Sequence, residues 1–429
     1  MPDRAGAAAR PIKKYGNAHG IELLAPAGDL EKLKFAIEYG ADAVYFGGHV
    51  GSLRAAAGNL SASEIYEGVG FAHQRGRRAY LALNIYAHDS ELDAIEAFLG
   101  EIKAAGIDGF IVSEPGVMAL VREAIPDARL HLSTQASLTN ARAARFWHSA
   151  GISRVVLARE MSLYEIRGLA SGAPEGLEIE AFAHGAMCIA YSGRCLMSAA
   201  MTGRSANSGE CAHPCRYKYS IVEEKRPGEY FPLEQDLYGS YILNSKDLCM
   251  IRHIPEMAAA GISSIKIEGR MKSAYYVAAV TRAYRAALDM WHADPGSYAF
   301  DEGWLSELMK ASHREFTTGF YFGQAGPSAQ ASAAGGYIQE YDFVGIVKGY
   351  DSAAKVALVE QRNKFSLGEE LEAFGPPAGA FTFRVEGMRD AEGAAISSAP
   401  HPQQLVYIKM DAPVNENYIL RRHKLQNAV

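Results

Sequence analysis

The stretch IELLAPAGDLEKLKFAIEYGADAVYFGG, Ile21 to Gly48 of a 429-residue chain, decides the fold class. It opens with a largely apolar run at 21–28, which is typical of a buried strand. The segment 29–40 repeats apolar residues at helical spacing, with Asp29 as its N-cap and Gly40 as its C-cap. A second apolar run follows at once. Strand, helix and strand in this order favour a parallel sheet covered by helices.

The same alternation continues along the next 240 or so residues. The second predicted helix, at 61–76, begins with Ser61 and Glu64 at capping-box spacing. Short, regular intervals favour a (β/α)8 barrel of the TIM type over an open doubly wound sheet. The lack of a G-x-G-x-x-G motif after the first strand weakens the dinucleotide-binding alternative. Further strands are predicted at 78–87, 107–115, 128–135, 152–159, 177–185 and 263–270, and a helix at 273–291 closes the ring.

The chain divides into four parts by composition. Residues 1–20 contain no continuous apolar segment, so we predict a disordered lead and not a signal peptide, with a cytoplasmic location. A catalytic domain is expected at 21–330, with a cysteine-rich insertion at about 186–262. Short strand-like runs separated by Gly, Pro, Asp and Asn predict a small all-β barrel domain at 336–429.

Composition limits the possible partners. No apolar run approaches the roughly 18 residues that span a bilayer, so no membrane contact is expected. The net charge of -6 does not suggest a nucleic-acid binder, although a local basic patch could still bind one. The oligomeric state is not predictable from these features. The count of five cysteines is odd, and the cytosol keeps thiols reduced, so a disulfide framework is a poor interpretation.

Four of the five cysteines lie within 28 residues, in the segment HGAMCIAYSGRCLMSAAMTGRSANSGECAHPC. Cys188 and Cys195 are seven positions apart, and Cys211 and Cys215 are four apart. Four thiolates suit zinc or an iron–sulfur cluster, and this spacing alone does not choose between them. Structural or single-thiol roles are the remaining alternative. Cys249, on a segment that looks helical, is interpreted as a small buried hydrophobe or as a fifth thiol near the cluster.

Several motifs in the same order resemble the U32 family, historically called collagenase-like peptidases. They are EAFAHGAMCIAYSGRCLMS, LLAPAGDLEKLKFAIEYGADAVYFGG, NSKDL, KIEGRMKSAYYVA, VEQRNKFSLGEELE and ILRRHK, between about Ile21 and Arg422. The chain is most similar to the branch involved in tRNA uridine hydroxylation. That resemblance implies formation of 5-hydroxyuridine at the wobble position, with prephenate as hydroxyl donor and a [4Fe-4S] cluster in place of zinc. By match to the family motif, its ligands are Cys188, Cys195, Cys211 and Cys215.

Two other functions stay open. A peptidase needs an activated nucleophile or a metal-bound water, and the chain has no H-E-x-x-H or G-x-S-x-G motif. His184 lies near Cys188 and His213 lies between two cysteines, but four crowded thiols suit a cluster better than a lone nucleophile. The third possibility is a non-catalytic RNA-binding or assembly protein whose cluster only stabilises the insertion.

Polar residues at the predicted strand ends would converge on one mouth of the barrel. Lys266 and Glu268 lie on one face of a buried strand that ends at Arg270, where burial of charge requires a partner. An arginine fork, for which Arg194 and Arg270 are candidates, suits a dicarboxylate such as prephenate. Each of these residues could instead have only a structural role at the start of a loop, and the same applies to Pro26 and Glu114, which also end predicted strands. The candidates are His184, Glu268 and Arg270 for catalysis, and Asn84, Gln135, Arg159, Tyr191, Arg194 and Lys266 for substrate binding.

Contacts to RNA are predicted from two short runs. Tyr191 and the segment RYKY at 216–219 combine aromatic and basic side chains, which can stack on bases and bind phosphates. The same alternation is typical of an ordinary strand with one exposed face. The segment RRHK at 421–424 is a second basic run, in the expected β domain.

Overall fold

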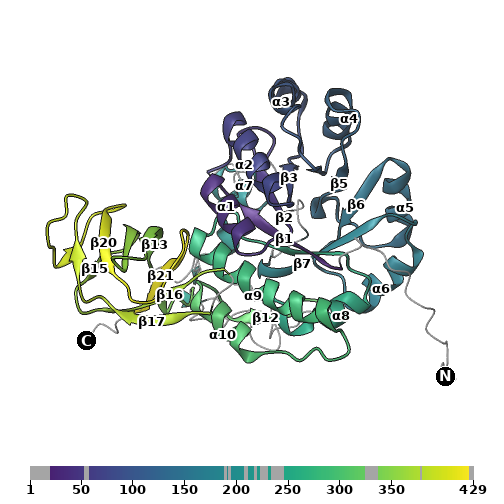
Figure 1. Ribbon diagram of the computed structural model, residues 1–429. Helices are drawn as coiled ribbons and strands as arrows, with labels where there is room; N and C mark the ends of the chain where they lie inside the picture. Colours follow the sequence, from purple (N-terminus) through teal and green to yellow (C-terminus); the bar gives the residue numbers. More distant parts are fainter. Residues whose placement is uncertain are drawn as a thin grey trace.

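The protein consists of a helix-covered barrel and a smaller β domain beside it, as the computed structural model shows in Figure 1. Residues 1–19 of the predicted lead, Cys188, Arg194 and the run 217–219 lie outside the residues that the structure describes. The described residues are 20–52, 58–187, 191, 195–206, 211–216, 220–222, 230–232, 246–323, 337–376 and 379–424.

Eight parallel strands form a closed barrel. Each strand pairs with the next along the chain, and the last pairs with both the first and the seventh, which closes the ring. Their residues are almost all buried, as expected for strands with packed side chains on both faces. The predicted (β/α)8 architecture is therefore confirmed. The strands are β1 (Glu22–Ala27), β2 (Ala43–Gly47), β3 (Arg78–Leu83), β4 (Gly109–Val112), β5 (Leu130–Leu132), β6 (Ile152–Val156), β7 (Glu178–Ala186) and β11 (Ser264–Ile267).

The helices begin where the sequence placed their capping residues. The Asp29 carboxylate accepts a hydrogen bond from Lys32 N at 2.8 Å, and Ser61 and Glu64 form the predicted capping box. The first helix ends at Glu38 with Tyr39 as its C-cap, one residue before the predicted cap, and Gly40 follows with a φ of 105°. The helices of the barrel are α1 (Leu30–Glu38), α2 (Ala62–Gln74), α3 (Asp89–Ile102), α4 (Pro115–Ala124), α5 (Ala141–Ser149), α6 (Leu163–Gly172), α8 (Ile254–Ala259), α9 (Ala274–Ala293) and α10 (Glu302–Lys310).

The segment between β7 and β11 contains more strand than the sequence indicated. Cys249 ends a short strand, β10 (Asp247–Cys249), that pairs antiparallel with β7, so the helical interpretation of this segment was wrong. Three residues are too few for a periodic pattern, and their partners lie over 60 positions away. Cys249 is buried, as predicted. The strand β12 (Phe316–Thr317) extends the sheet further, and α7 (Met197–Thr202), β8 (Ser220–Val222) and β9 (Tyr230–Pro232) precede β10.

The C-terminal domain is an antiparallel half-barrel around a core of its own. Its seven strands lie in the order β17-β16-β21-β13-β14-β20-β18. Val344, Val359 and Leu371 are among the fully buried residues between them. The predicted β domain is confirmed. Its strands are β13 (Tyr341–Asp351), β14 (Val356–Gln361), β16 (Glu370–Phe374), β17 (Phe381–Arg384), β18 (Met388–Arg389), β20 (Leu405–Lys409) and β21 (Ile419–His423), with β15 (Phe365–Ser366) and β19 (Ser398–Ala399) as a separate pair.

A buried ion pair joins the two domains. The Arg421 side chain is fully buried and contacts the carboxylates of Glu307, at 2.9 Å, and of Glu372. On α1, the Tyr39 hydroxyl donates to Asn417 O at 2.8 Å. These contacts hold the β domain against α1, α9 and α10 on the outside of the barrel (Figure 1). Among the described residues, no helix combines the length and apolar character needed to cross a membrane.

Candidate functional site

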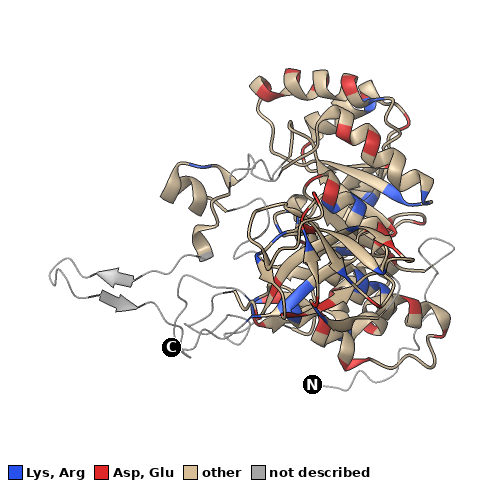
Figure 2. Ribbon diagram, turned by 60° about the vertical axis from the view of Figure 1, so that its left-hand side comes forward, with Lys and Arg blue, Asp and Glu red and all other residues tan. Residues whose placement is uncertain are grey.

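Three cationic side chains line one arc of the barrel mouth, at the ends of β6 and β11. Figure 2 shows Lys and Arg residues among the barrel strands. The Arg270 guanidinium donates to Ser52 Oγ at 2.8 Å and is almost fully buried. Gly47 makes room for it, because a Cβ at this position would lie 2.7 Å from Arg270 Nη1. Arg159 lies over the Phe182 ring at 3.9 Å, with Nη2 3.8 Å from Glu268 Oε2. We call Arg159, Lys266 and Arg270 the cationic wall.

Lys266 is the member of this wall that lies within a strand, β11, and it is buried. Its Nζ donates to Glu180 Oε1 at 2.9 Å and lies 4.2 Å from the centre of the Tyr45 ring. Burial lowers the pKa of Lys266, and the charge of Glu180 opposes that shift. The Tyr45 hydroxyl in turn donates to Ile267 O at 3.0 Å and lies 3.3 Å from Glu268 Oε2. Tyr45 therefore connects Lys266 with Glu268. Sequence analysis missed Tyr45, although its place two residues before the end of a strand was a usable signal.

A network of buried charges forms the floor beneath the mouth. Arg154 is 1% exposed and contacts Glu22 Oε1 at 2.5 Å, Glu178 Oε2 at 2.7 Å and Glu180 Oε2 at 3.2 Å. Glu180 thus bridges Arg154 and Lys266. Burial alone would raise the pKa of Glu22, but the charge of Arg154 and its hydrogen bond outweigh that effect and lower it. The Glu22 carboxylate is therefore held ionised against Arg154.

The neighbouring arc of the mouth, from β3 to β5, carries polar but uncharged side chains. Asn84 follows β3, Ser113 follows β4, and Ser133 and Gln135 follow β5. Ser113 Oγ donates to Asn84 O at 3.0 Å, and the Tyr86 hydroxyl donates to Gln135 O at 2.6 Å. We call Asn84, Ser133 and Gln135 the amide wall. The structure therefore brings Asn84, Gln135, Arg159, Lys266, Glu268 and Arg270 to one mouth.

His184 does not face this mouth. Its ring packs against Tyr276 and Tyr284 of α9 and against Phe316, and it is 1% exposed. Burial first, and then the nearby charges of Lys272 and His313, lower the pKa of His184 to about 3. A neutral ring enclosed by aromatic residues does not support the predicted catalytic role, so His184 is left out of the proposed site.

The buried, neutral His184 should make the fold sensitive to acid. An unfolded histidine takes up its proton near pH 6.5, whereas folded His184 does so only near pH 3. The unfolded state therefore binds more protons as pH falls below 6.5, and stability falls with it. Replacing His184 by Phe should reduce the loss of unfolding free energy between pH 7 and pH 5 by about 2 kcal/mol. Denaturant titration of both proteins at the two pH values measures this, and equal losses would contradict it.

The other candidates at the strand ends have structural partners or lie elsewhere. Pro26 is buried within β1. The Glu114 carboxylate caps α4, where it accepts from Gly116 N and Val117 N, both at 2.8 Å. Tyr191 is 44% exposed, and Arg194 lies outside the described residues.

Three of the four predicted thiol ligands lie in or next to two short helical segments. Cys195 comes just before α7, whereas Cys211 and Cys215 lie before and within the turn η3 (Pro214–Arg216). Ala212 N donates to Ser198 Oγ at 3.0 Å and ties the segments together. Cys188 lies outside the described residues, and among those described no three His, Cys, Asp or Glu side chains form a metal site. The thiols have the chemistry of cluster ligands, but the described residues do not form a complete ligand set.

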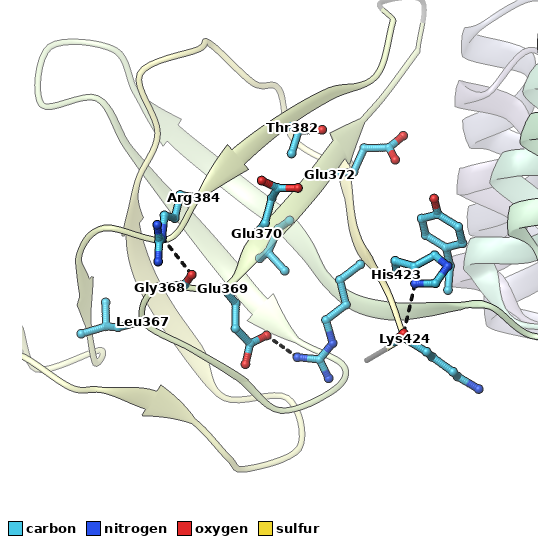
Figure 3. Close-up of a pocket in the computed structure, with 12 residues that line it drawn as sticks. Leu367, Gly368, Glu369, Glu370, Glu372, Thr382, Arg384, His423 and Lys424 are labelled. Carbon is cyan, nitrogen blue, oxygen red and sulfur yellow. Dashed lines mark hydrogen bonds and ion pairs between the residues drawn. The ribbon is translucent and has the colours of Figure 1, made fainter. Parts of the chain in front are cut away.

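A separate pocket of about 670 Å³ lies in the C-terminal domain (Figure 3). Residues of the basic run 421–424 line it, but most of their charge is already paired. Arg422 contacts Glu369, and Arg421 points instead into the domain interface. Lys424 is half-exposed and lies 4.0 Å from Asp342. The described part of this run is therefore a mixed-charge surface.

Comparison with known proteins agrees with this architecture. The model of "Peptidase family U32" matches residues 28–331, and that of its C-terminal domain matches residues 339–421. The chain is 42% identical to "tRNA hydroxylation protein P1" of Bacillus subtilis, over 94% of this chain and 95% of that protein. It is 36% identical to "tRNA hydroxylation protein P" of Escherichia coli, over 93% and 96%. It is 33% identical to "Collagenase" of Porphyromonas gingivalis, over 87% and 91%. By both domain models and by these relatives, the chain belongs to peptidase family U32.

Proposed function

We propose that this protein is a tRNA modification enzyme that forms 5-hydroxyuridine at the wobble position, with prephenate as hydroxyl donor. The similarity to two tRNA hydroxylation proteins over more than nine-tenths of the chain carries this proposal. The geometry of the mouth supports it, because one arc is cationic and the other is polar and uncharged. A dicarboxylate suits the first arc, and a nucleobase flipped out of its stack suits the second.

The side chains of the cationic wall define the roles in this proposal. Arg270 and Arg159 bind the carboxylates of the donor, since guanidinium groups offer paired N–H donors. Lys266, held by Glu180, adds a third positive charge at the base of the mouth. Glu268 lies beside Arg159 and Tyr45, where it can hold or release a proton next to the bound donor. Lys266 and Arg270 are both at least 95% buried, so little of either side chain is exposed to solvent.

Nucleoside analysis of tRNA tests the reaction itself. Digested tRNA from a strain lacking this protein should lose 5-hydroxyuridine and its derivatives, as measured by mass spectrometry. The wild-type chain should restore them. Unchanged modification in the deletion strain would reject hydroxylation and favour a non-catalytic RNA-binding or assembly role.

We further propose a [4Fe-4S] cluster bound by Cys188, Cys195, Cys211 and Cys215, with Zn²⁺ as the alternative metal. Such a cluster supplies one-electron transfer when bound. Anaerobically purified protein should contain about four iron and four sulfide per chain. The Cys188→Ser variant should lose both the cluster and the modification, whereas the matched Cys249→Ala variant should keep both, because Cys249 is a buried thiol outside the set. A colourless wild-type protein with one zinc would contradict the cluster.

Peptide hydrolysis is the second candidate, favoured by the family description and by the relative named collagenase. Among the described residues, Cys249 faces His184 across the β10–β7 pairing. Burial raises the pKa of Cys249 to about 11 and lowers that of His184 to about 3. The thiol thus stays protonated, and this pair is a poor nucleophile and base. Release of peptides from gelatin by the purified protein, lost on Cys249→Ala replacement, would restore this candidate.

A further inference from the structure

The Gln135 side chain has an unused hydrogen-bond donor beside the mouth. Gln135 lies in the single turn η1 (Thr134–Ala136) that follows β5, and it is 3% exposed. Its Nε2 is buried and has no hydrogen-bond partner among the residues that the structure describes. Leaving an amide donor unpaired in such a place costs roughly 1–3 kcal/mol, so a ligand that accepts from it is favoured.

Neighbouring side chains fix which end of this amide is the donor. Ser133 Oγ lies within 3.5 Å of Asn84 Nδ2 and 3.4 Å of Gln135 N, both of which donate to it. The Ser133 hydroxyl proton is then directed to Gln135 Oε1, at 3.3 Å. A chain from Asn84 through Ser133 to Gln135 therefore holds Oε1 as the acceptor and leaves Nε2 as the donor.

The Gln135 amide lies next to the cationic wall along the rim of the barrel. The strand β5 pairs with β6, which leads to Arg159 in the next loop along the rim. Consider a pyrimidine whose C5 faces the prephenate bound by Arg159 and Arg270. Its 4-position, which is next to C5, would then face the neighbouring arc, where Gln135 lies. In uracil this position is a carbonyl, which accepts a hydrogen bond, whereas in cytosine it is an amino group, which donates one.

We propose that the Gln135 amide donates to the 4-carbonyl of the target pyrimidine and so selects uracil over cytosine. This inference rests on the proposed function, because it assumes an RNA base in the mouth. Cytosine would place two donors face to face, with neither satisfied, and the Asn84–Ser133 chain opposes the amide flip that would relieve this. Asn84 and Ser133 act through Gln135 and are positioning residues.

Binding of three synthetic anticodon stem-loop RNAs to the full chain tests the proposal. The RNAs differ only at the wobble base, which is uracil, cytosine or 2-pyrimidinone, the last of which lacks the 4-carbonyl. Fluorescence anisotropy with the wild-type protein should show affinity for uracil about tenfold above that for 2-pyrimidinone, and a larger preference over cytosine. The Gln135→Met variant, of similar shape, should bind uracil and 2-pyrimidinone equally.

The Gln135→Glu variant gives a result that a folding defect cannot imitate. At about pH 8 its carboxylate can accept from the cytosine amino group, so its preference should shift from uracil to cytosine. Wild-type protein that binds none of the RNAs would reject the proposed function. Wild-type protein that binds uracil RNA without distinguishing 2-pyrimidinone would overturn only the role of Gln135. The same holds if the Gln135→Glu variant keeps the wild-type preference.

Discussion

Replacing Arg270 by lysine should weaken the binding of prephenate by about 100-fold and leave the fold intact. Arg270 is 96% buried, its guanidinium donates to Ser52 Oγ at 2.8 Å, and Gly47 leaves space that a Cβ would fill. A lysine at this position offers one point charge in place of two parallel N–H donors, and its shorter head cannot reach the same site. Isothermal titration calorimetry with prephenate measures the loss without requiring a complete reaction.

A matched control separates this effect from that of replacing any paired arginine by lysine. Arg252 also binds a carboxylate with two nitrogens, both 2.6 Å from Glu302, but it lies on the surface. The Arg252→Lys variant should bind prephenate as the wild type does, and both variants should unfold at similar temperatures. An Arg270→Lys protein with wild-type affinity would remove Arg270 from the donor site. The tRNA assay would still decide independently whether the protein hydroxylates uridine.

Local sequence patterns were sufficient to predict the barrel and half of its mouth. Strand periodicity and capping residues depend on neighbours within a few positions, so the order of strands and helices was correct. The rule that parallel strands end at one mouth then located Asn84, Gln135, Arg159 and Arg270. Their location can be predicted without knowing which residues they contact, because the topology alone brings the strand ends together.

His184 shows where the strand pattern fails. Strict alternation from Glu180 and Phe182 would point His184 into the barrel. The pairing of β7 with β11 shifts by one residue, so that Lys266 lies opposite Phe182 and the next residue, Ile267, lies opposite His184. This bulge turns His184 toward α9. No local signal in the sequence marks the shift.

The charged floor was invisible to sequence analysis for a different reason. Glu22 and Arg154 each looked like an isolated polar residue in an apolar strand, yet they pair across 132 positions of the chain. Burial of either residue alone would be unfavourable, so its place in the core depends on a partner that no sequence window contains. Tyr45 differs from them: its contacts with Glu268 and Lys266 are also long-range, but its place near the end of a strand was a local signal.

Removing Arg154 should therefore destabilise the protein strongly. The Arg154→Met variant keeps most of the side-chain volume but leaves Glu22, Glu178 and Glu180 without their shared cation. We expect a loss of about 3–5 kcal/mol in the free energy of unfolding, which is a large share of the stability of most domains. Denaturant titration measures it. The Arg129→Met variant is the control, since Arg129 contacts the same Glu178 at 3.5 Å from an exposed position and should cost at most about 1 kcal/mol.

The pH dependence of this loss distinguishes buried charge from lost packing. In the wild type, Arg154 holds the pKa of Glu22 below its usual value, so this carboxylate contributes stability at neutral pH that is lost as pH falls through its lowered pKa. In Arg154→Met, only Arg78 and Tyr80 still oppose the effect of burial, so we expect the pKa of Glu22 to rise and protonation at about pH 5 to remove part of the cost. The gap between variant and wild type should therefore be smaller at about pH 5 than at pH 8. An equal gap at both values would mean that an unpaired Glu22 carboxylate is not the source of the cost, and would contradict the role of Arg154 as the cation that stabilises it.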